Sequence, residues 1–242
     1  MTAAVVCAAL FLPACLLCCA AVTAAARLHN ERALMRTLGE KQMVLTFDDG
    51  PCPESTSAIL DALQHCGVRA VFFMTAQRAA RHPELVRRIQ QEGHAIGLHG
   101  LSHRSPWLWG MLPGYARREI KQGTEILRSL GAQPLYFRPA WGRLTPFTAL
   151  FARREGLKLY FWHVMAEDWL PDATAFSIEQ RLRARRGERA VVCLHDAFHR
   201  GSGGAALHTA AALRHFIPVS LAQGWQFILP ERSACPSAKE AA

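Results

Sequence analysis

The main body of the sequence contains no CxxC pair of cysteines. Four of the eight cysteines lie in an apolar stretch near the N-terminus, and the other four are Cys52, Cys66, Cys193 and Cys235. Structural zinc sites and thioredoxin-like redox centres need closely spaced pairs, so this absence argues against both. A disulfide between Cys52 and Cys66 is one alternative, and buried free thiols are the other.

Internal repeats and low-complexity linkers are also absent, and the 242 residues are short for two ordinary domains. We expect one folded domain at residues 42–230, preceded by a charged connector at 27–41 and followed by a frayed tail at 231–242. Half of the residues are hydrophobic and 19% are charged, which argues against disorder. The net charge of +9 favours anionic partners. No nucleic-acid motif is present, so nucleic acid is not an expected partner.

Charged side chains are missing from Thr2–Ala26, a segment long enough to cross a bilayer. Its apolar part ends in small residues at which a signal peptidase could cut, so residues 1–26 are predicted to be a signal peptide or an N-terminal membrane anchor. The segment has no basic residues at its start, and three arginines follow it, beginning at Arg27. Because positive residues favour the cytoplasmic side, the orientation stays open. Export to the cell envelope or the medium is the favoured localisation.

After residue 41, short apolar runs alternate with amphipathic stretches about seven times. The runs predict strands at Met43–Phe47, Ala70–Met74, Ala95–Leu98, Tyr136–Arg138, Leu159–Val164, Ala190–Leu194 and Trp225–Leu229. Helices are predicted at Glu54–Gln64, at Pro83–Glu92 and after Thr145, which can cap a helix that begins with Pro146. This alternation predicts a parallel α/β fold. We favour a barrel over an open sheet, because polar residues suited to chemistry follow five separate strands.

The first predicted strand ends in two adjacent acids, Asp48 and Asp49, before the turn Gly50-Pro51. Side chains alternate along a strand, so the two carboxylates can have different tasks. His99 and His103 follow the third strand four residues apart, and in a helical turn both imidazoles can face one point. Two neutral imidazoles and one carboxylate can bind Zn²⁺ and leave a position open for water. Each motif alone has an ordinary interpretation, as a turn or as a chance histidine pair.

Three more strands end in residues suited to a catalytic site. An arginine can hold a carboxylate ionised and in place, and a rigid turn with proline and glycine can direct a backbone N–H into a site. Five such motifs in order are harder to explain as surface loops. The residues concerned are Arg138 and Trp141, Asp168 and Trp169, and Leu194 and His195.

The five motifs closely resemble those of the polysaccharide deacetylases, also called the NodB-homology or carbohydrate esterase family 4 group, over roughly Gln42–Leu229. The resemblance implies an α/β fold that is an irregular (β/α)₇ barrel. It implies that Asp48 is the catalytic base. It also implies that Asp49, His99 and His103 bind one divalent metal ion, for which Zn²⁺ is the favoured candidate.

The resemblance also implies roles for the other motif residues. Arg138 would orient the base, Trp141 would line the groove and lend its backbone N–H to the oxyanion, and His195 would be the general acid. We expect Asp168 to hold Arg138 in place. We expect an apolar pocket for the acetyl methyl group, formed by Trp141, Trp169 and Leu194.

Two positions differ from the usual family pattern. Gly100 occupies the place after the first metal-binding histidine, where a serine or threonine usually steadies the loop. Met165 stands where many members have an acid. Neither change removes a predicted ligand or catalyst, so we expect activity. The two changes are expected to bear on the metal affinity and on the rigidity of the loop.

The predicted function is metal-dependent removal of N-acetyl groups from an N-acetylated polysaccharide or amino sugar, such as peptidoglycan or a chitin-like glycan. One alternative is an O-acetyl esterase that acts on a polysaccharide such as xylan. Another is an inactive carbohydrate-binding module. A magnesium phosphoesterase is disfavoured, because Mg²⁺ prefers oxygen ligands to histidine. The oligomeric state is left open.

Overall fold

A parallel sheet forms the centre of the protein, for which a computed structural model describes residues 3–198 and 204–230. Its strands are β1 (Gln42–Asp48), β2 (Val71–Met74), β3 (Ala95–Leu98), β4 (Tyr136–Phe137), β5 (Lys158–Leu159), β6 (Val164–Met165), β7 (Ala190–His195) and β8 (Gln226–Phe227). Their order is β5-β4-β3-β2-β1-β7-β6, with β8 beside β1. Every pairing is parallel, and the sheet curls into an irregular half-barrel, as predicted. The predicted tail and Cys235 lie outside the described residues.

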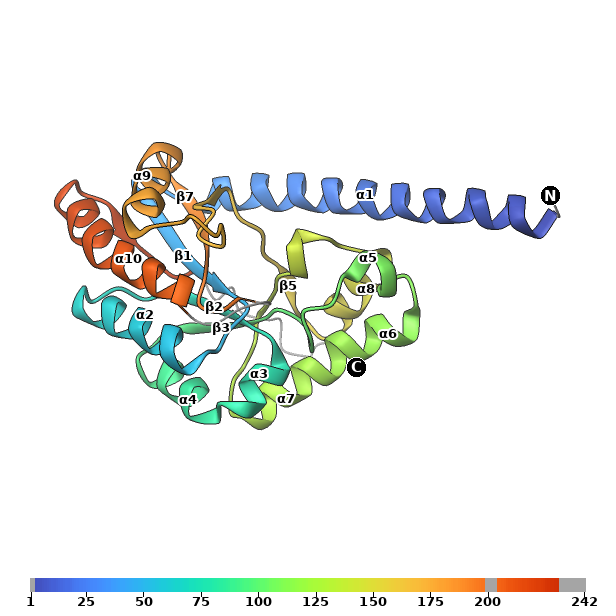
Figure 1. Ribbon diagram of the computed structural model, residues 1–242, viewed down its shortest axis with the longest axis horizontal. Helices are drawn as coiled ribbons and strands as arrows, with labels where there is room; N and C mark the ends of the chain where they lie inside the picture. Colours follow the sequence, from blue (N-terminus) through green and yellow to red (C-terminus); the bar gives the residue numbers. More distant parts are fainter. Residues whose placement is uncertain (1–2, 199–203, 231–242) are drawn as a thin grey trace, which may run out of the picture.

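Helices surround this sheet (Figure 1). The helical elements after β1 are α2 (Pro53–His65), α3 (Ala76–Arg81), α4 (Pro83–Gln91), α5 (Pro106–Trp109), α6 (Pro113–Arg117), the π-helical turn η1 (Arg118–Gln122), α7 (Gly123–Ser129), the 3₁₀ turn η2 (Ala140–Gly142), α8 (Pro146–Arg154), α9 (Ala175–Arg185) and α10 (Gly204–Ala222). Of these, α2, α4, α9 and α10 lie along the outer face of the sheet (Figure 1). The predicted cap of α8 is confirmed. Thr145 Oγ1 accepts the backbone N–H of Thr148 at 3.2 Å, and Pro146 opens the helix.

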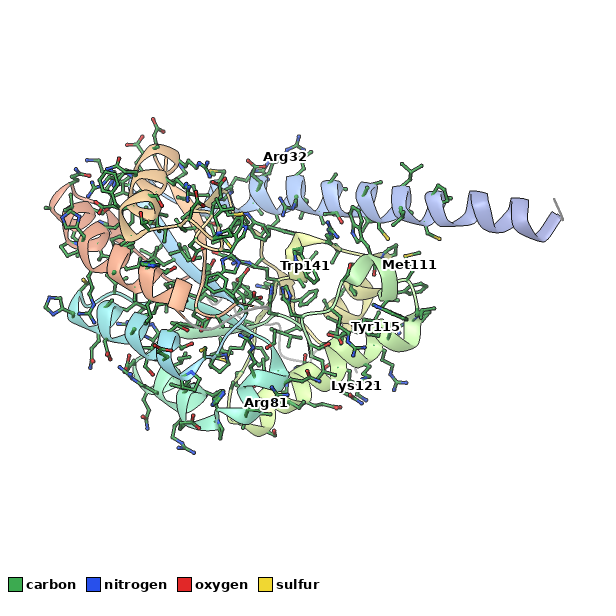
Figure 2. The ribbon with its side chains drawn as sticks, viewed as in Figure 1. Arg32, Arg81, Met111, Tyr115, Lys121 and Trp141 are labelled. Carbon is green, nitrogen blue, oxygen red and sulfur yellow. The ribbon has the colours of Figure 1, made fainter. Side chains whose placement is uncertain are left out.

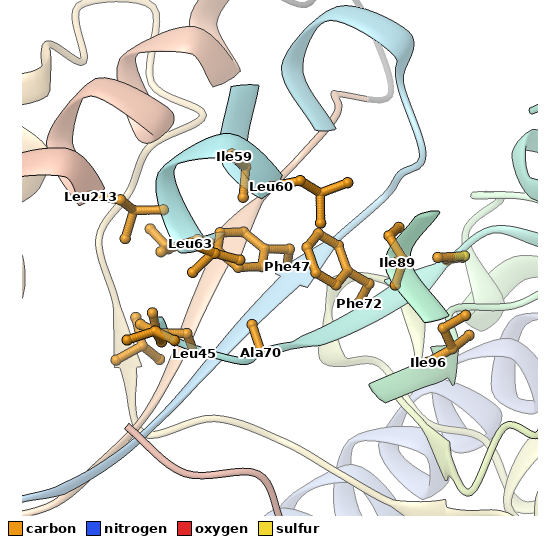
Figure 3. Close-up of a cluster of buried hydrophobic side chains, with 14 of the residues drawn as sticks. Leu45, Phe47, Ile59, Leu60, Leu63, Ala70, Phe72, Ile89, Ile96 and Leu213 are labelled. Atoms are coloured by element: carbon orange, nitrogen blue, oxygen red, sulfur yellow. The ribbon is translucent and has the colours of Figure 1, made fainter. Parts of the chain in front are cut away.

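The main hydrophobic core lies between the sheet and these helices. Phe47 of β1 and Phe72 of β2 stack with their ring centroids 5.0 Å apart. Both rings face α2, where they pack with the buried side chains of Ile59, Leu60 and Leu63 (Figure 3). Each such fully buried side chain contributes roughly 1.5–3 kcal/mol of hydrophobic free energy. This packing holds the carboxyl end of β1, where Asp48 lies, against β2 and α2.

A smaller cluster fills the inside of the half-barrel. Because successive strand residues point to opposite faces, Val44 of β1 and Phe73 of β2 face inward, opposite to Phe47 and Phe72. Leu34 and Leu38 from the N-terminal part of the chain pack against them. The inward face also carries Thr46 and Asp48. β1 therefore places two polar residues inside the half-barrel, next to this hydrophobic cluster.

The fifth predicted strand, Leu159–Val164, is two strands in the structure. β5 pairs with β4, whereas β6 pairs with β7, and these two strands lie at the opposite ends of the sheet order. Residues 160–163 connect them. Among the described residues, no ladder joins β5 to β6, so this connection crosses the open side of the half-barrel. A continuous apolar run in the sequence conceals the break, because the crossing residues Tyr160 and Phe161 are also buried.

The predicted leader and most of the predicted connector form one helix, α1 (Ala3–Thr37). Its first part extends away from the domain, and its second part lies along the sheet (Figure 1). Residues 27–37 are therefore helical, with Leu34 buried in the inner cluster. In the part of the chain that the structure describes, no helix is long and apolar enough to span a membrane.

Candidate active site

Asp49, His99 and His103 converge at the carboxyl end of the strands. Asp49 Oδ1 lies 3.3 Å from His99 Nε2 and 3.1 Å from His103 Nε2. One potential ligand atom from each of the three residues lies within 4.8 Å of the other two. Asp49 has a φ of 77°, a left-handed conformation that non-glycine residues adopt at a cost of about 1–3 kcal/mol. This turn of the backbone directs its carboxylate toward the two imidazoles.

The donor atoms of this cluster fit a divalent metal ion. His99 donates its Nδ1–H to the backbone oxygen of Arg138 at 2.7 Å, which leaves the Nε2 lone pair directed at the cluster. Asp49 Oδ1 is buried and has no hydrogen-bond partner among the described residues. Burial opposes ionisation, but His99 and His103 outweigh it and hold the pKa of Asp49 well below its usual range. Two nitrogens and one ionised oxygen are a ligand set that Zn²⁺ favours.

The neighbouring acid, Asp48, has a different partner. Its Oδ1 accepts a hydrogen bond from Arg138 Nη1 at 2.7 Å. The Arg138 side chain is fully buried, and its guanidinium carbon lies 4.1 Å from the ring centroid of Phe73. Its other N–H groups donate to Thr46 Oγ1 at 2.6 Å, to the Tyr160 carbonyl at 3.0 Å and to the Phe161 carbonyl at 3.2 Å. The arginine therefore orients Asp48 from a fixed position.

Asp168 contacts His195, and the expectation that it holds Arg138 is wrong. Its Oδ1 lies 2.8 Å from His195 Nδ1, and its Oδ2 accepts the His195 backbone N–H at 2.8 Å and the Thr209 hydroxyl at 2.9 Å. Both carboxylate oxygens of Asp168 thus accept hydrogen bonds from residues of β7 and α10. Burial lowers the pKa of His195, but the Asp168 carboxylate and other acids outweigh it and raise the pKa to about 9.

Two of the three predicted pocket residues lie at the site. Trp141 is 46% exposed, and its ring centroid is 4.2 Å from that of His103. Trp169 is 39% exposed, and its ring centroid is 5.3 Å from that of His195. Leu194 is fully buried in the outer core, so its predicted place in the pocket is wrong.

The residue of β7 that faces the site is Cys193, beside Leu194. Adjacent strand residues point to opposite faces, and this alternation places Leu194 outward and Cys193 inward. Cys193 Sγ donates to Asp48 Oδ2 at 3.3 Å. Burial, with a further contribution from Asp48, raises the pKa of the Cys193 thiol well above its usual value, so it remains protonated.

Glu119, on η1, supports the loop that carries His103, and no sequence motif indicated this role. Its Oε2 accepts the backbone N–H groups of Leu101 and Ser102, both at 3.0 Å, and its Oε1 accepts the Ser102 hydroxyl at 2.8 Å. Gly100 has a φ of +99°, and a Cβ there would lie 3.1 Å from Glu119 Oε2. Glycine at this position thus leaves room for the carboxylate that braces the loop.

Asp196 is a second site residue without a predicted role. Its Oδ1 accepts the Gly50 backbone N–H at 3.0 Å, and its Oδ2 accepts the Thr56 hydroxyl at 2.7 Å. A Cβ on Gly50 would collide with this carboxylate. Burial raises the pKa of Asp196 to about 7. Its position directly after His195, at the end of an apolar strand, was the available signal.

The chain resembles several proteins of known activity. A family model described as Polysaccharide deacetylase matches residues 35–160. A peptidoglycan-N-acetylglucosamine deacetylase of Bacillus cereus is 31% identical over 192 residues, covering 78% of this chain and 86% of that protein. A chitooligosaccharide deacetylase of Bradyrhizobium is 31% identical over 196 residues, covering 78% of this chain and 88% of that protein.

Solved structures agree with these sequence relationships. The crystal structure of a peptidoglycan N-acetylglucosamine deacetylase matches with a TM-score of 0.70 and 30% identity, covering 78% of this chain and 86% of the other. A family 4 acetyl xylan esterase from Clostridium thermocellum, in complex with a cobalt ion, matches with a TM-score of 0.66 and 29% identity. That match covers 77% of this chain and 87% of the other.

Proposed function

The chain belongs to the polysaccharide deacetylase family, and we propose that it removes N-acetyl groups from a glycan with the help of one divalent metal ion. The observation that supports this function is that two adjacent carboxylates have different partners. Asp49 faces two histidines, and Asp48 faces a buried arginine. An amide hydrolase of this kind needs both a metal site and a base that the metal does not consume.

Asp49, His99 and His103 would hold the ion, and Zn²⁺ suits their nitrogen and oxygen donors best. When bound, the ion supplies a Lewis acid that polarises the acetyl carbonyl and lowers the pKa of a water molecule toward neutrality. His99 keeps its Nε2 available because its Nδ1–H is held by the Arg138 carbonyl. The metal-binding histidine is therefore tied to the backbone of the arginine that orients the base.

Asp48 acts as the base that accepts a proton from the attacking water. Arg138 holds its Oδ1 at 2.7 Å, so Oδ2, which accepts only the longer contact of 3.3 Å from the Cys193 thiol, is the oxygen that receives the proton. The four hydrogen bonds of Arg138 to Asp48, Thr46, Tyr160 and Phe161 fix the direction of this carboxylate. Such positioning lowers the barrier because the reacting groups need not be ordered during the reaction.

His195 acts as the acid that protonates the departing amine. A pKa of about 9 keeps its imidazole protonated at neutral pH, and Asp168 fixes the ring through Nδ1. The backbone N–H of Trp141 would donate to the oxyanion, a contribution of roughly 3 kcal/mol for one well-placed donor. Trp141 and Trp169 would flank the acetyl group with their partly exposed rings.

We propose peptidoglycan or a related N-acetylated wall glycan as the substrate. The B. cereus relative is named for peptidoglycan N-acetylglucosamine, and a net charge of +9 suits an anionic wall polymer. Action on such a polymer requires export, which the apolar segment Thr2–Ala26 would direct. An O-acetyl esterase is the second candidate, because the acetyl xylan esterase from C. thermocellum shares the fold at 29% identity.

Two single variants test the assignment of the base and of the metal ligands. Asp48→Asn should abolish acetate release while the bound metal survives, because Asp48 is bonded to Arg138 and not to the histidine pair. His99→Ala should lose both activity and metal. Acetate release and metal content by mass spectrometry are measured on the same samples. Undiminished acetate release by Asp48→Asn would show that another residue is the base.

A further inference from the structure

The open side of the half-barrel is crossed by a segment whose carbonyls hold Arg138, the arginine that orients Asp48. Residues 160–163 connect β5 to β6, and these two strands lie at opposite ends of the sheet order and do not pair with each other. The carbonyls of Tyr160 and Phe161 in this segment accept hydrogen bonds from Arg138 Nε and Nη2. The position of Arg138, and through it that of Asp48, therefore depends on a stretch of backbone that lacks strand pairing on one side.

Asn30 of α1 takes the place of the missing strand. Its Nδ2 donates to the Leu159 carbonyl at 2.7 Å, and its Oδ1 accepts the Phe161 N–H at 2.8 Å. One side-chain amide thus pairs with two backbone groups on the edge of β5, in the same way as a neighbouring strand. The two contacts join residues 129 and 131 positions apart in the sequence.

Arg27, one turn earlier on α1, packs on two aromatic side chains of the same segment. Its guanidinium carbon lies 4.5 Å from the ring centroid of Trp162 and 5.3 Å from that of Phe161. It also fills the space beside Gly142, where a Cβ would collide with the guanidinium. Gly142 follows Trp141, so Arg27 touches both the crossing segment and the turn that carries the exposed tryptophan.

Arg27 and Asn30 themselves lie in a part of the chain that the family model does not cover, since its match begins at residue 35. We propose that Arg27 and Asn30 are positioning residues for the reaction, which hold residues 159–162 so that Tyr160 and Phe161 can fix Arg138. The inference rests on the proposed function for its kinetic consequences. A helix that only anchored the domain would affect stability and leave the turnover number of the folded enzyme unchanged.

Alanine variants of the two residues, each with a control on the same helix, test this proposal in the full-length, metal-loaded enzyme. Asn30→Ala is compared with His29→Ala, and Arg27→Ala with Arg32→Ala. His29 and Arg32 are exposed, and Figure 2 shows the Arg32 side chain pointing away from the domain. We expect kcat to fall about 10- to 100-fold in the first variant of each pair, the loss that a displacement of catalytic groups by about 1 Å produces. The controls should keep the kcat of the wild type.

Metal content should change little in both variants, because the metal ligands lie on other elements. KM should change little in Asn30→Ala, because Asn30 contacts only backbone groups of Leu159 and Phe161. Equal kcat values in Asn30→Ala, Arg27→Ala and their controls would overturn the proposal. A double-mutant cycle adds a stricter criterion. If Asn30 acts through Arg138, Asn30→Ala should cost much less in an Arg138→Lys background than in the wild type. Additive losses in the cycle would overturn the positioning role.

A readout that needs no activity separates this proposal from the proposed function. Hydrogen exchange of the Arg138 Nε–H, measured by NMR, should be slow in the wild type and markedly faster in Asn30→Ala. If no glycan yields acetate but exchange changes in this way, the proposed function fails and the positioning survives. Unchanged exchange would overturn the positioning. Should Asn30→Ala fail to fold, Arg27→Lys serves in its place, because it keeps the charge and loses the planar stacking.

Discussion

Two adjacent aspartates contact different partners because of the backbone between them. Asp48 is still part of β1 and points into the half-barrel toward Arg138. Asp49 is the next residue, and its φ of 77° turns its carboxylate toward His99 and His103. Asp196 holds this turn by accepting the Gly50 N–H. The different partners of the two carboxylates, on which the proposed roles of base and metal ligand rest, thus come from a strained residue that its neighbours keep in place.

Glu119 should set the metal affinity through the loop that carries His103. Glu119→Ala removes three hydrogen bonds to Leu101 and Ser102, and loss of such support typically weakens metal binding about 10- to 100-fold. Glu119→Gln should retain most of the affinity, because its amide can accept from the two N–H groups and donate to the hydroxyl. Competition with a chelator of known affinity measures the change.

Glu125→Ala is the matched control for Glu119, because Glu125 is exposed and pairs with exposed Lys121. The control should bind metal as tightly as the wild type. Equal affinities of Glu119→Ala and Glu125→Ala would contradict the role of Glu119.

Asp168 should set the pH range over which His195 acts as an acid. The carboxylate stabilises the imidazolium and helps to raise the pKa of His195 to about 9. Asp168→Asn removes this charge, so the pKa falls and the protonated acid is lost at lower pH. The alkaline limb of the profile of kcat against pH should therefore move to lower pH.

Thr209→Val provides the control for this shift, because it removes only the hydroxyl that bonds Asp168 Oδ2 and leaves the contact with His195. Its alkaline limb should lie near that of the wild type. An alkaline limb at the wild-type pH in Asp168→Asn would show that His195 is not the titrating acid.

Sequence motifs located the strand-end residues of the site but not how they pair. Asp168 and His195 lie in different motifs, and nothing in their spacing indicates that Asp168 contacts His195 and not Arg138. The error at Leu194 had an available remedy, because alternation along a strand already places Leu194 and His195 on opposite faces. Glu119 could not be predicted, since its partners Leu101 and Ser102 are reached only through the tertiary packing of η1.

At the scale of elements, the structure differs most from the sequence-based prediction in the short strands β5 and β6 and in α1. The predicted strand Leu159–Val164 is apolar throughout, and its division into β5 and β6 depends on which neighbours each half meets. The long strands β1 and β7 were located correctly, because their burial makes them continuous apolar runs. The sequence of α1 gave no indication that Arg27 and Asn30 would contact the crossing segment.

Removing α1 in two steps should separate its leader from its role in the fold. A chain starting at Arg27 keeps Asn30 and the buried Leu34, so it should fold and retain activity. A chain starting at Gln42 loses Leu34 and Leu38 from the inner cluster, at roughly 1.5–3 kcal/mol each. Its melting temperature should be lower by at least about 6 °C.

Thermal unfolding followed by circular dichroism measures this difference. Equal melting temperatures of the two truncated chains would show that the second half of α1 contributes nothing to the fold. A loss of stability already in the chain that starts at Arg27 would place the stabilising contacts earlier, at Thr23 and its hydrogen bonds to Leu144.

At the scale of the whole molecule, the parallel order of the strands brings the separate motifs to one end of the half-barrel. β1, β3, β4 and β7 each end next to a residue of the site, and every pairing is parallel. The carboxyl ends of parallel strands lie together, which is why a chain with distant motifs can assemble one centre. The same arrangement leaves the rings of Trp141 and Trp169 partly exposed at that end.

Acetate release from an N-acetylated glycan tests the central claim most directly. The full-length protein is incubated with peptidoglycan or chitin oligomers, and in parallel with acetylated xylan. Each substrate is tested with the protein as prepared, after removal of metal with a chelator, and after addition of Zn²⁺ to the chelated sample. The account predicts release of acetate, its loss with the chelator and its return with Zn²⁺. Acetate release that is unaffected when the chelator has removed the metal would contradict the metal-dependent mechanism, and release from acetylated xylan alone would contradict the N-acetyl substrate.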